Sequence, residues 1–167
     1  MGTRGTTTVI IDGKVRVLQY GQWDHYPEGQ GLDALKFARR LKDPEILQEF
    51  KDKVRALRTV ENLEDEPDVQ VYNNLPSKDK ADGYEKIFPE FHRNTGTQIL
   101  SMILDDKVHR VHLDEDGIQW GEGFPTINLD EETYRFAYYE HDHAFPLSNL
   151  PTDDEFLKMY EDYEADN

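Results

Sequence analysis

The chain has 167 residues, a net charge of −16 and no cysteine. This length fits a single domain over residues 1–167 with a substantial core, and the aromatic content of 11% argues against a disordered chain. The lack of cysteine excludes disulfides, thiolate catalysis and thiolate metal sites. No apolar stretch approaches the roughly 18 residues of a spanning helix, and no charged-then-apolar leader precedes the first strand, so we expect a cytoplasmic protein with no membrane partner.

The charge is unevenly distributed along the chain. Residues 1–58 are mildly basic, with eleven Lys or Arg against eight Asp or Glu, which leaves 8 against 27 for residues 59–167. Direct nucleic-acid binding is therefore not expected. The acidic half either keeps the chain soluble or, alternatively, mimics nucleic acid and engages a basic protein.

Residues 1–58 predict a β-hairpin followed by two helices. The β-branched run 6–11 predicts a strand, Asp12-Gly13 signals a two-residue turn, and 14–20 alternates as the return strand. Helical spacing predicts a helix over 32–41, and Asp43-Pro44 predicts the start of a second one. The expected buried stripes are Leu32, Leu35, Ala38 and Leu41 in the first helix, and Ile46, Leu47, Phe50, Val54 and Leu57 in the second.

Residues 59–167 predict a loop, a short helix, a β-meander and a C-terminal helix. Residues 61–76 favour a loop with a short strand at 69–72, and the apolar run 98–104 predicts a buried helix with Asn94 or Thr95 as its N-cap. Strands are expected at 108–113, 118–120, 126–129 and 133–139, with a turn at Asp116-Gly117. Thr152 and Glu155 form a capping box, and the helix it opens is expected to bury Phe156, Met159, Tyr160 and Tyr163.

These elements together predict an α+β fold. An N-terminal β-hairpin and an antiparallel sheet are expected to carry helices packed on one face.

The densest run of unusual residues lies between the hairpin and the first helix. It reads Gly-Gln-Trp-Asp-His-Tyr-Pro-Glu-Gly-Gln-Gly over residues 21–31, which we call the signature loop. Together with the opening Met1-Gly2-Thr3-Arg4-Gly5, it resembles the N-terminal signature of a family of uncharacterised phage and bacterial proteins. That family begins MGTR and carries Q-(F/W)-D-x-Y-P-x-G-x-G after a short hairpin. The resemblance implies a phage-type protein acting in the host cytoplasm, and it brings no established activity.

The signature loop is the predicted ligand pocket. Its glycines precede a helix start and place backbone N–H groups where an anion can bind, the aromatic rings offer a floor, and Arg4 approaches from the start of the hairpin. A small polar, phosphate-bearing or nucleotide-like molecule fits such a site, and no cofactor is expected. The alternative is a scaffold in which the aromatic residues are core and the glycines only join strand to helix. The predicted ligand-binding residues are Arg4, Gln22, Trp23, Asp24, Tyr26, Glu28, Gly29 and Gly31.

Histidines offer a weaker indication of a site. His109 and His112 have a spacing of three on a predicted strand and point to opposite faces, whereas His141 and His143 share a face. The second pair can chelate zinc or nickel if a third ligand comes from elsewhere. No third ligand is identified, so no metal is expected.

Two patterns suggest catalysis. Gly5-Thr6-Thr7-Thr8 followed by a hairpin resembles the mature start of proteasome-type β subunits, which implies an N-terminal-nucleophile hydrolase using Thr6. The chain departs from this pattern, because Gly21-Gln22 stands at the end of the second strand in place of an aspartate and no lysine falls where the third catalytic partner is expected. Asp24 and Glu28 form the second pattern, a pair of carboxylates able to divide acid and base roles. We expect a binding protein that sequesters a ligand or blocks a host protein, and treat catalysis as the alternative.

Overall fold

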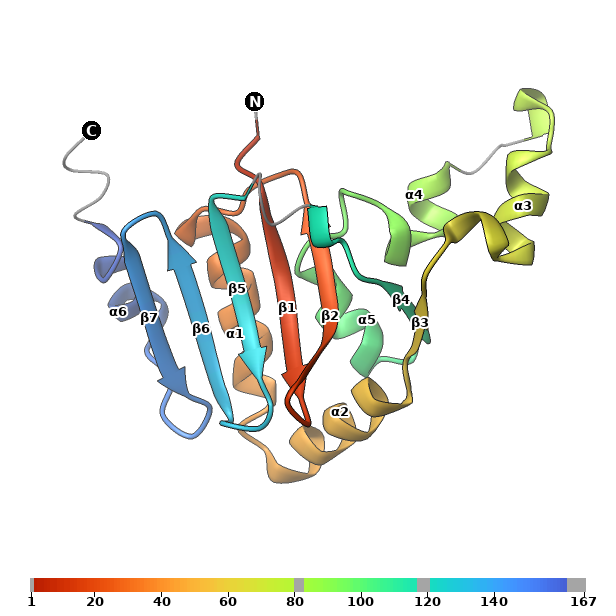
Figure 1. The fold of residues 1–167 in the computed structure, drawn as a ribbon. Helices are drawn as coiled ribbons and strands as arrows, with labels where there is room; N and C mark the ends of the chain where they lie inside the picture. Colours follow the sequence, from red (N-terminus) through yellow and green to blue (C-terminus); the bar gives the residue numbers. More distant parts are fainter. Residues whose placement is uncertain (1, 80–82, 117–120, 162–167) are drawn as a thin grey trace.

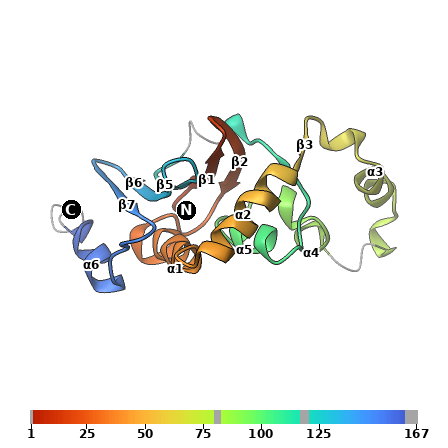
Figure 2. The same cartoon turned by 90° about the horizontal axis from the view of Figure 1, so that it is seen from below.

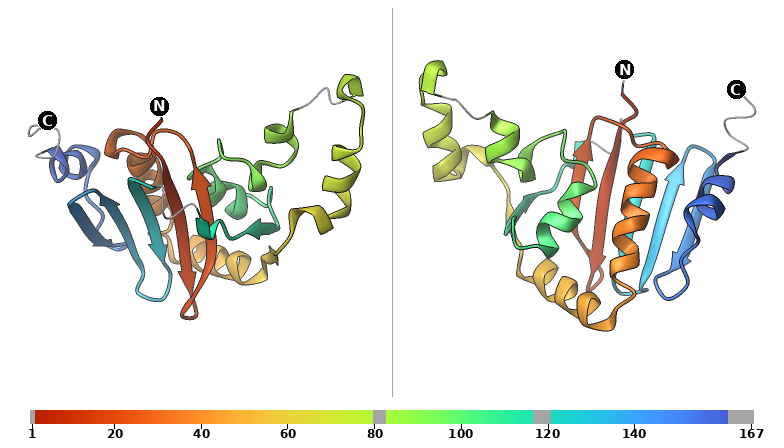
Figure 3. Two further views of the ribbon diagram at one scale, coloured as in Figure 1. Left: turned by 45° about the horizontal axis from the view of Figure 1, so that its top comes forward. Right: turned by 180° about the vertical axis from the view of Figure 1, so that it is seen from behind.

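The computed structural model describes residues 2–79, 83–116 and 121–161. A five-stranded sheet runs in the order β2-β1-β5-β6-β7, and helices cover one of its faces (Figures 1 and 3). The predicted α+β class is confirmed. Among the described residues, no helix has the length and apolar character needed to cross a membrane.

The N-terminal hairpin forms as predicted. Strands β1 (Gly5–Ile11) and β2 (Lys14–Gly21) pair antiparallel around Asp12-Gly13, both of which have the positive φ values, 55° and 71°, that a tight hairpin turn requires. The carboxylate of Asp130 accepts hydrogen bonds from both turn N–H groups, at 2.7 and 2.8 Å. The turn is therefore fixed by its own sequence and by a second turn far along the chain.

The sheet is mixed rather than wholly antiparallel. Strands β5 (Gly123–Asn128) and β6 (Thr133–Tyr138) form the antiparallel pair predicted at 126–129 and 133–139. Strand β7 (His141–Pro146), which was not predicted, extends the meander antiparallel to β6. The first strand of this meander then pairs parallel with β1. A parallel neighbour requires a long crossover, and here the intervening helices on the covered face supply it.

In the part of the chain that the structure describes, four helices pack against the sheet. They are α1 (Leu32–Arg40), α2 (Pro44–Ala56), α5 (Gln98–Leu104) and α6 (Asp153–Lys158), which Figure 2 shows from below. The predicted N-cap Asp43 and the capping box of Thr152 with Glu155 are both present. Side chains from both layers form one hydrophobic core. Most of the predicted stripe residues are buried, while Leu32, Ile46 and Leu47 lie partly buried at its margin.

Other local expectations were wrong or lie outside the described residues. The predicted loop over 61–76 contains helix α3 (Pro67–Asn73), and the strand predicted at 69–72 is part of this helix. Pro67 can start a helix because the first helical N–H needs no partner, and Val69 is the buried residue of α3. Helix α5 begins after Thr97 and has no side-chain cap, so neither Asn94 nor Thr95 plays that role. Met159 is 38% exposed because α6 ends before it. The predicted strand 118–120, Gly117 of the preceding turn and Tyr163 are outside the described residues.

A small lobe projects beside the sheet. Strand β3 (Arg58–Val60) pairs parallel with β4 (Arg110–His112), and beyond them α3 and α4 (Tyr84–Ile87) extend away from the body (Figures 1 and 2). The guanidinium of Arg110, on β4, forms ion pairs with Glu66, Asp68 and Glu90. These ion pairs connect separate segments of the lobe. The predicted strand at 108–113 therefore belongs to this lobe and not to the meander.

Candidate functional site

The signature loop is anchored by a histidine that sequence reasoning did not select. His25 is 0% exposed, and its ring lies on glycines of two neighbouring strands, where a Cβ on Gly5 or Gly21 would come within 2.6 or 2.3 Å of ring carbons. Its Nδ1 lies 2.9 Å from the carbonyl oxygen of Trp23. Because a carbonyl only accepts, Nδ1 carries the proton. Burial lowers the pKa of His25 to about 4, so the ring is neutral at physiological pH.

The rest of the loop is occupied with internal hydrogen bonds. The N–H groups of Gly29 and Gly31 donate to the carbonyl of Tyr26, at 3.1 and 3.3 Å, and that of Gln30 donates to the carbonyl of Asp24 at 2.6 Å. These N–H groups are thus engaged and do not form the predicted anion cradle. The observation favours the scaffold interpretation for this part of the loop.

The signature loop holds the segment before α5. The Gln22 N–H donates to the carbonyl of Arg93 at 2.9 Å, and the indole N–H of Trp23 donates to Asn94 Oδ1 at 2.8 Å. Further along, the side-chain oxygen of Gln30 accepts from both the N–H and the hydroxyl of Thr97. The loop therefore fixes the backbone that carries Arg93.

The predicted site residues do not share one cavity lining. Trp23, Asp24 and Glu28 are exposed, and Glu28 lines a shallow surface pocket beside α6. Tyr26 packs against the edge of the core. Arg4, by contrast, lines a pocket of about 660 Å³ next to the loop. Whether the others bind a ligand stays a prediction, and the pocket of Arg4 becomes the candidate site.

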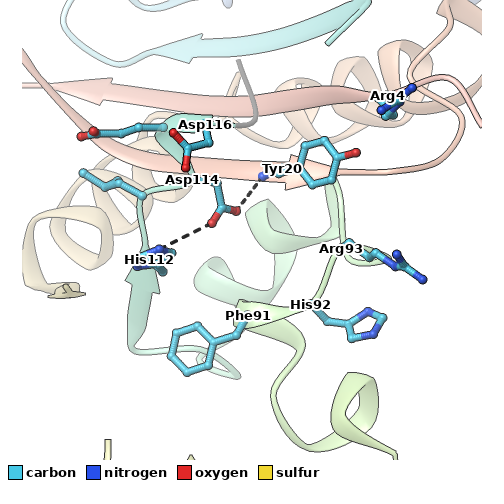
Figure 4. Close-up of a pocket in the computed structure, with 10 residues that line it drawn as sticks. Arg4, Tyr20, Phe91, His92, Arg93, His112, Asp114 and Asp116 are labelled. Carbon is cyan, nitrogen blue, oxygen red and sulfur yellow. Dashed lines mark hydrogen bonds and ion pairs between the residues drawn. The ribbon is translucent and has the colours of Figure 1, made fainter. Parts of the chain in front are cut away.

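This pocket lies between the main sheet and the projecting lobe. Arg4, His92 and Arg93 lie on one side, His112, Asp114 and Asp116 lie on the other, and Tyr20 lies between them (Figure 4). We call it the arginine pocket. Phe91 adds a second aromatic surface, and the full lining is Arg4, Tyr20, Phe91, His92, Arg93, His112, Leu113, Asp114, Glu115 and Asp116.

The two arginines of the pocket differ from the other arginines of the chain. Of nine arginines, six form ion pairs with carboxylates, namely Arg39, Arg40, Arg55, Arg58, Arg110 and Arg135. Arg16 donates to two backbone carbonyls. Within the described part of the chain, only Arg4 and Arg93 have neither kind of side-chain partner. In a protein with 35 acidic residues, two guanidinium groups without such a partner at one pocket give this pocket a positively charged side.

The opposite wall carries a half-buried carboxylate. Asp114 Oδ2 accepts the backbone N–H of Tyr20 at 2.8 Å, and Oδ1 faces Nε2 of His112 at 3.9 Å. Nδ1 of His112 donates to the carbonyl of Val60 at 2.8 Å, which leaves Nε2 as the side directed at the pocket wall. Burial raises the pKa of Asp114, partly opposed by the Tyr20 N–H and by His112.

The other candidate residues lie away from this pocket. His141 and His143 share a face as predicted, and both rings pack against Tyr160, at centroid distances of 6.2 and 5.2 Å. No group of three potential His or carboxylate ligands for a metal occurs among the described residues. Thr6 is 1% exposed within β1, so its hydroxyl is not accessible to a substrate in this structure.

The arginine pocket could not be found from one stretch of sequence. It combines residues from positions 4, 20, 91–93 and 112–116, and these segments meet only through the packing of the lobe against β2. The one local signal was the His112-Leu113-Asp114 triplet at a strand end. Comparisons with protein-family models, curated proteins and solved structures found no match to the chain.

Proposed function

We propose that the protein binds a small anionic molecule in the arginine pocket. The observation that carries this proposal is the pair of unpaired arginines, because guanidinium groups bind phosphate and carboxylate through charge-assisted, often bidentate, hydrogen bonds. The volume of about 660 Å³ lies in the range of small-molecule sites. The aromatic rings of Tyr20 and Phe91 can cover a planar part of the ligand.

The signature loop has a supporting role in this function. Its bonds to Arg93 and Asn94 fix one side of the pocket, and His25 fixes the loop on the sheet. The loop therefore acts as a scaffold for a binding site whose ligand contacts lie next to it. This combines the two interpretations of the sequence, which placed either a pocket or a scaffold here.

A thermal-shift screen followed by calorimetry tests the proposal. Inorganic phosphate, pyrophosphate, nucleoside monophosphates and dicarboxylates are added at low ionic strength, and a ligand that binds the native state raises Tm. Arg4→Ala and Arg93→Ala should each weaken binding by about tenfold or more. Arg40→Ala is the matched control, since Arg40 pairs with Asp105 outside the pocket. Unchanged affinity in both pocket variants, or no anion that binds, would contradict the proposal.

The projecting lobe favours a second role, as a docking element for a basic protein of the host. Val71 on α3 is 64% exposed and Leu75 is 38% exposed, and the exposed carboxylates of Glu64 and Asp65 lie on the same lobe. A partner captured through these charges should be released as salt rises from about 0.05 to 0.5 M. Val71→Ser should reduce its capture, and equal capture by the variant and the parent protein would speak against the lobe.

A further inference from the structure

The two walls of the arginine pocket differ in charge. Arg4 and Arg93 lie on one side, and Asp114 lies across the pocket from them (Figure 4). A ligand with only negative charge would bind the two arginines and would bring that charge near the carboxylate of Asp114. The acidic wall therefore requires a group of opposite character on the ligand.

Asp114 has one oxygen available for such a group. Oδ2 accepts a hydrogen bond from the Tyr20 N–H, whereas Oδ1 lies 3.9 Å from Nε2 of His112, beyond hydrogen-bond distance. The side chain is only 30% exposed, so water solvates it incompletely. Because an ionised carboxylate can only accept hydrogen bonds, a partly buried carboxylate with one oxygen lacking a partner is stabilised by an N–H donor.

Tyr20 and Phe91 line the pocket along with these two walls. Aromatic side chains favour planar rings, which stack on them. The ligand that fits all three features has a phosphate for the arginines, a planar ring for the aromatic side chains and an amino group on that ring for Asp114.

We infer that the ligand is a nucleoside monophosphate whose base carries an exocyclic amino group, an inference that rests on the anion-binding function proposed above. Adenine and cytosine present such an amino donor, whereas hypoxanthine and uracil present a carbonyl acceptor at the same place. Asp114 accepts from the amino group and repels the carbonyl. The structure thus assigns base selection to Asp114 and phosphate binding to the arginines.

Calorimetric titration with matched nucleotides tests the inference. AMP should bind about tenfold or more tightly than IMP, and CMP should bind similarly better than UMP, because the wrong base leaves a buried acceptor facing a carbonyl. In Asp114→Asn the amide oxygen can still accept from Tyr20 while the amide nitrogen donates into the pocket. This variant should reverse both preferences, toward IMP and UMP.

The controls separate this inference from the function on which it rests. Asp105→Asn, which removes a carboxylate paired with Arg40 outside the pocket, should keep the preference for AMP and CMP. Equal affinity for AMP and IMP in the parent protein, or a preference unchanged in Asp114→Asn, would overturn the assignment while anion binding stands. Binding of pyrophosphate or dicarboxylates without any nucleotide would also overturn it. Loss of all anion binding would overturn both proposals.

Discussion

The buried imidazole of His25 makes the stability of this protein depend on pH in a defined window. The pKa of the ring is about 4 in the folded chain against an ordinary value of 6.5. The native state therefore holds the ring neutral while the unfolded chain takes up a proton below about pH 6.5, so acid favours unfolding. The stability that comes from keeping the His25 ring neutral is fully present above pH 6.5 and is lost as the pH falls toward 4.

The size of the effect follows from the two pKa values. Each tenfold difference in proton affinity corresponds to about 1.4 kcal/mol, so the separation between 6.5 and about 4 corresponds to a loss of about 3 kcal/mol. The marginal stability of most domains, about 5–15 kcal/mol, makes such a loss measurable.

His25→Asn is the variant that isolates this group. Asparagine can donate to the Trp23 carbonyl, as Nδ1 of His25 does, but it does not titrate. Its smaller side chain leaves a void and lowers stability at every pH. Urea-unfolding free energies measured from about pH 7 to pH 4 should therefore fall by about 3 kcal/mol more in the parent protein than in the variant. His109→Asn, at an exposed histidine, should track the parent protein. Parallel pH curves for the parent and His25→Asn would refute the reasoning.

Two further substitutions test how the signature loop and the C-terminal helix are held. Gly21→Ala places a methyl group 2.3 Å from the ring of His25 and should lower the free energy of urea unfolding by about 1–3 kcal/mol. Gly83→Ala is the control, because open space surrounds Gly83, and it should lower this free energy little. Equal effects would argue against close packing of the His25 ring on Gly21. Tyr160→Phe removes the hydrogen bond from the buried hydroxyl to the carbonyl of Phe136, 2.6 Å long, and should lower the unfolding free energy by about 1 kcal/mol. A Tyr160→Phe chain as stable as the parent would show that this bond adds nothing net.

The elements with local signals could be predicted from the sequence. The turn at Asp12-Gly13 signals its hairpin through the positive φ values that both residues adopt, and Asp43-Pro44 signals a helix start through a side-chain cap and a preset φ. The meander of β5 and β6 follows from alternation across a short turn. The wrong strand at 69–72 arose because a short run with two valines has the same pattern in a strand and in a brief helix.

The parallel pairing of β1 with β5 and the arginine pocket were decided only by the tertiary structure. Gly5 meets Gly123 across more than a hundred residues of chain, and no local pattern encodes which distant strand becomes a neighbour. In the same way, the sequence marked Arg4 as a candidate but not Arg93 as its companion. Unpaired arginines are recognisable only when every other charge has been placed in three dimensions. The sequence determined where the signature loop lies in the chain, and packing made that loop a support for the pocket beside it.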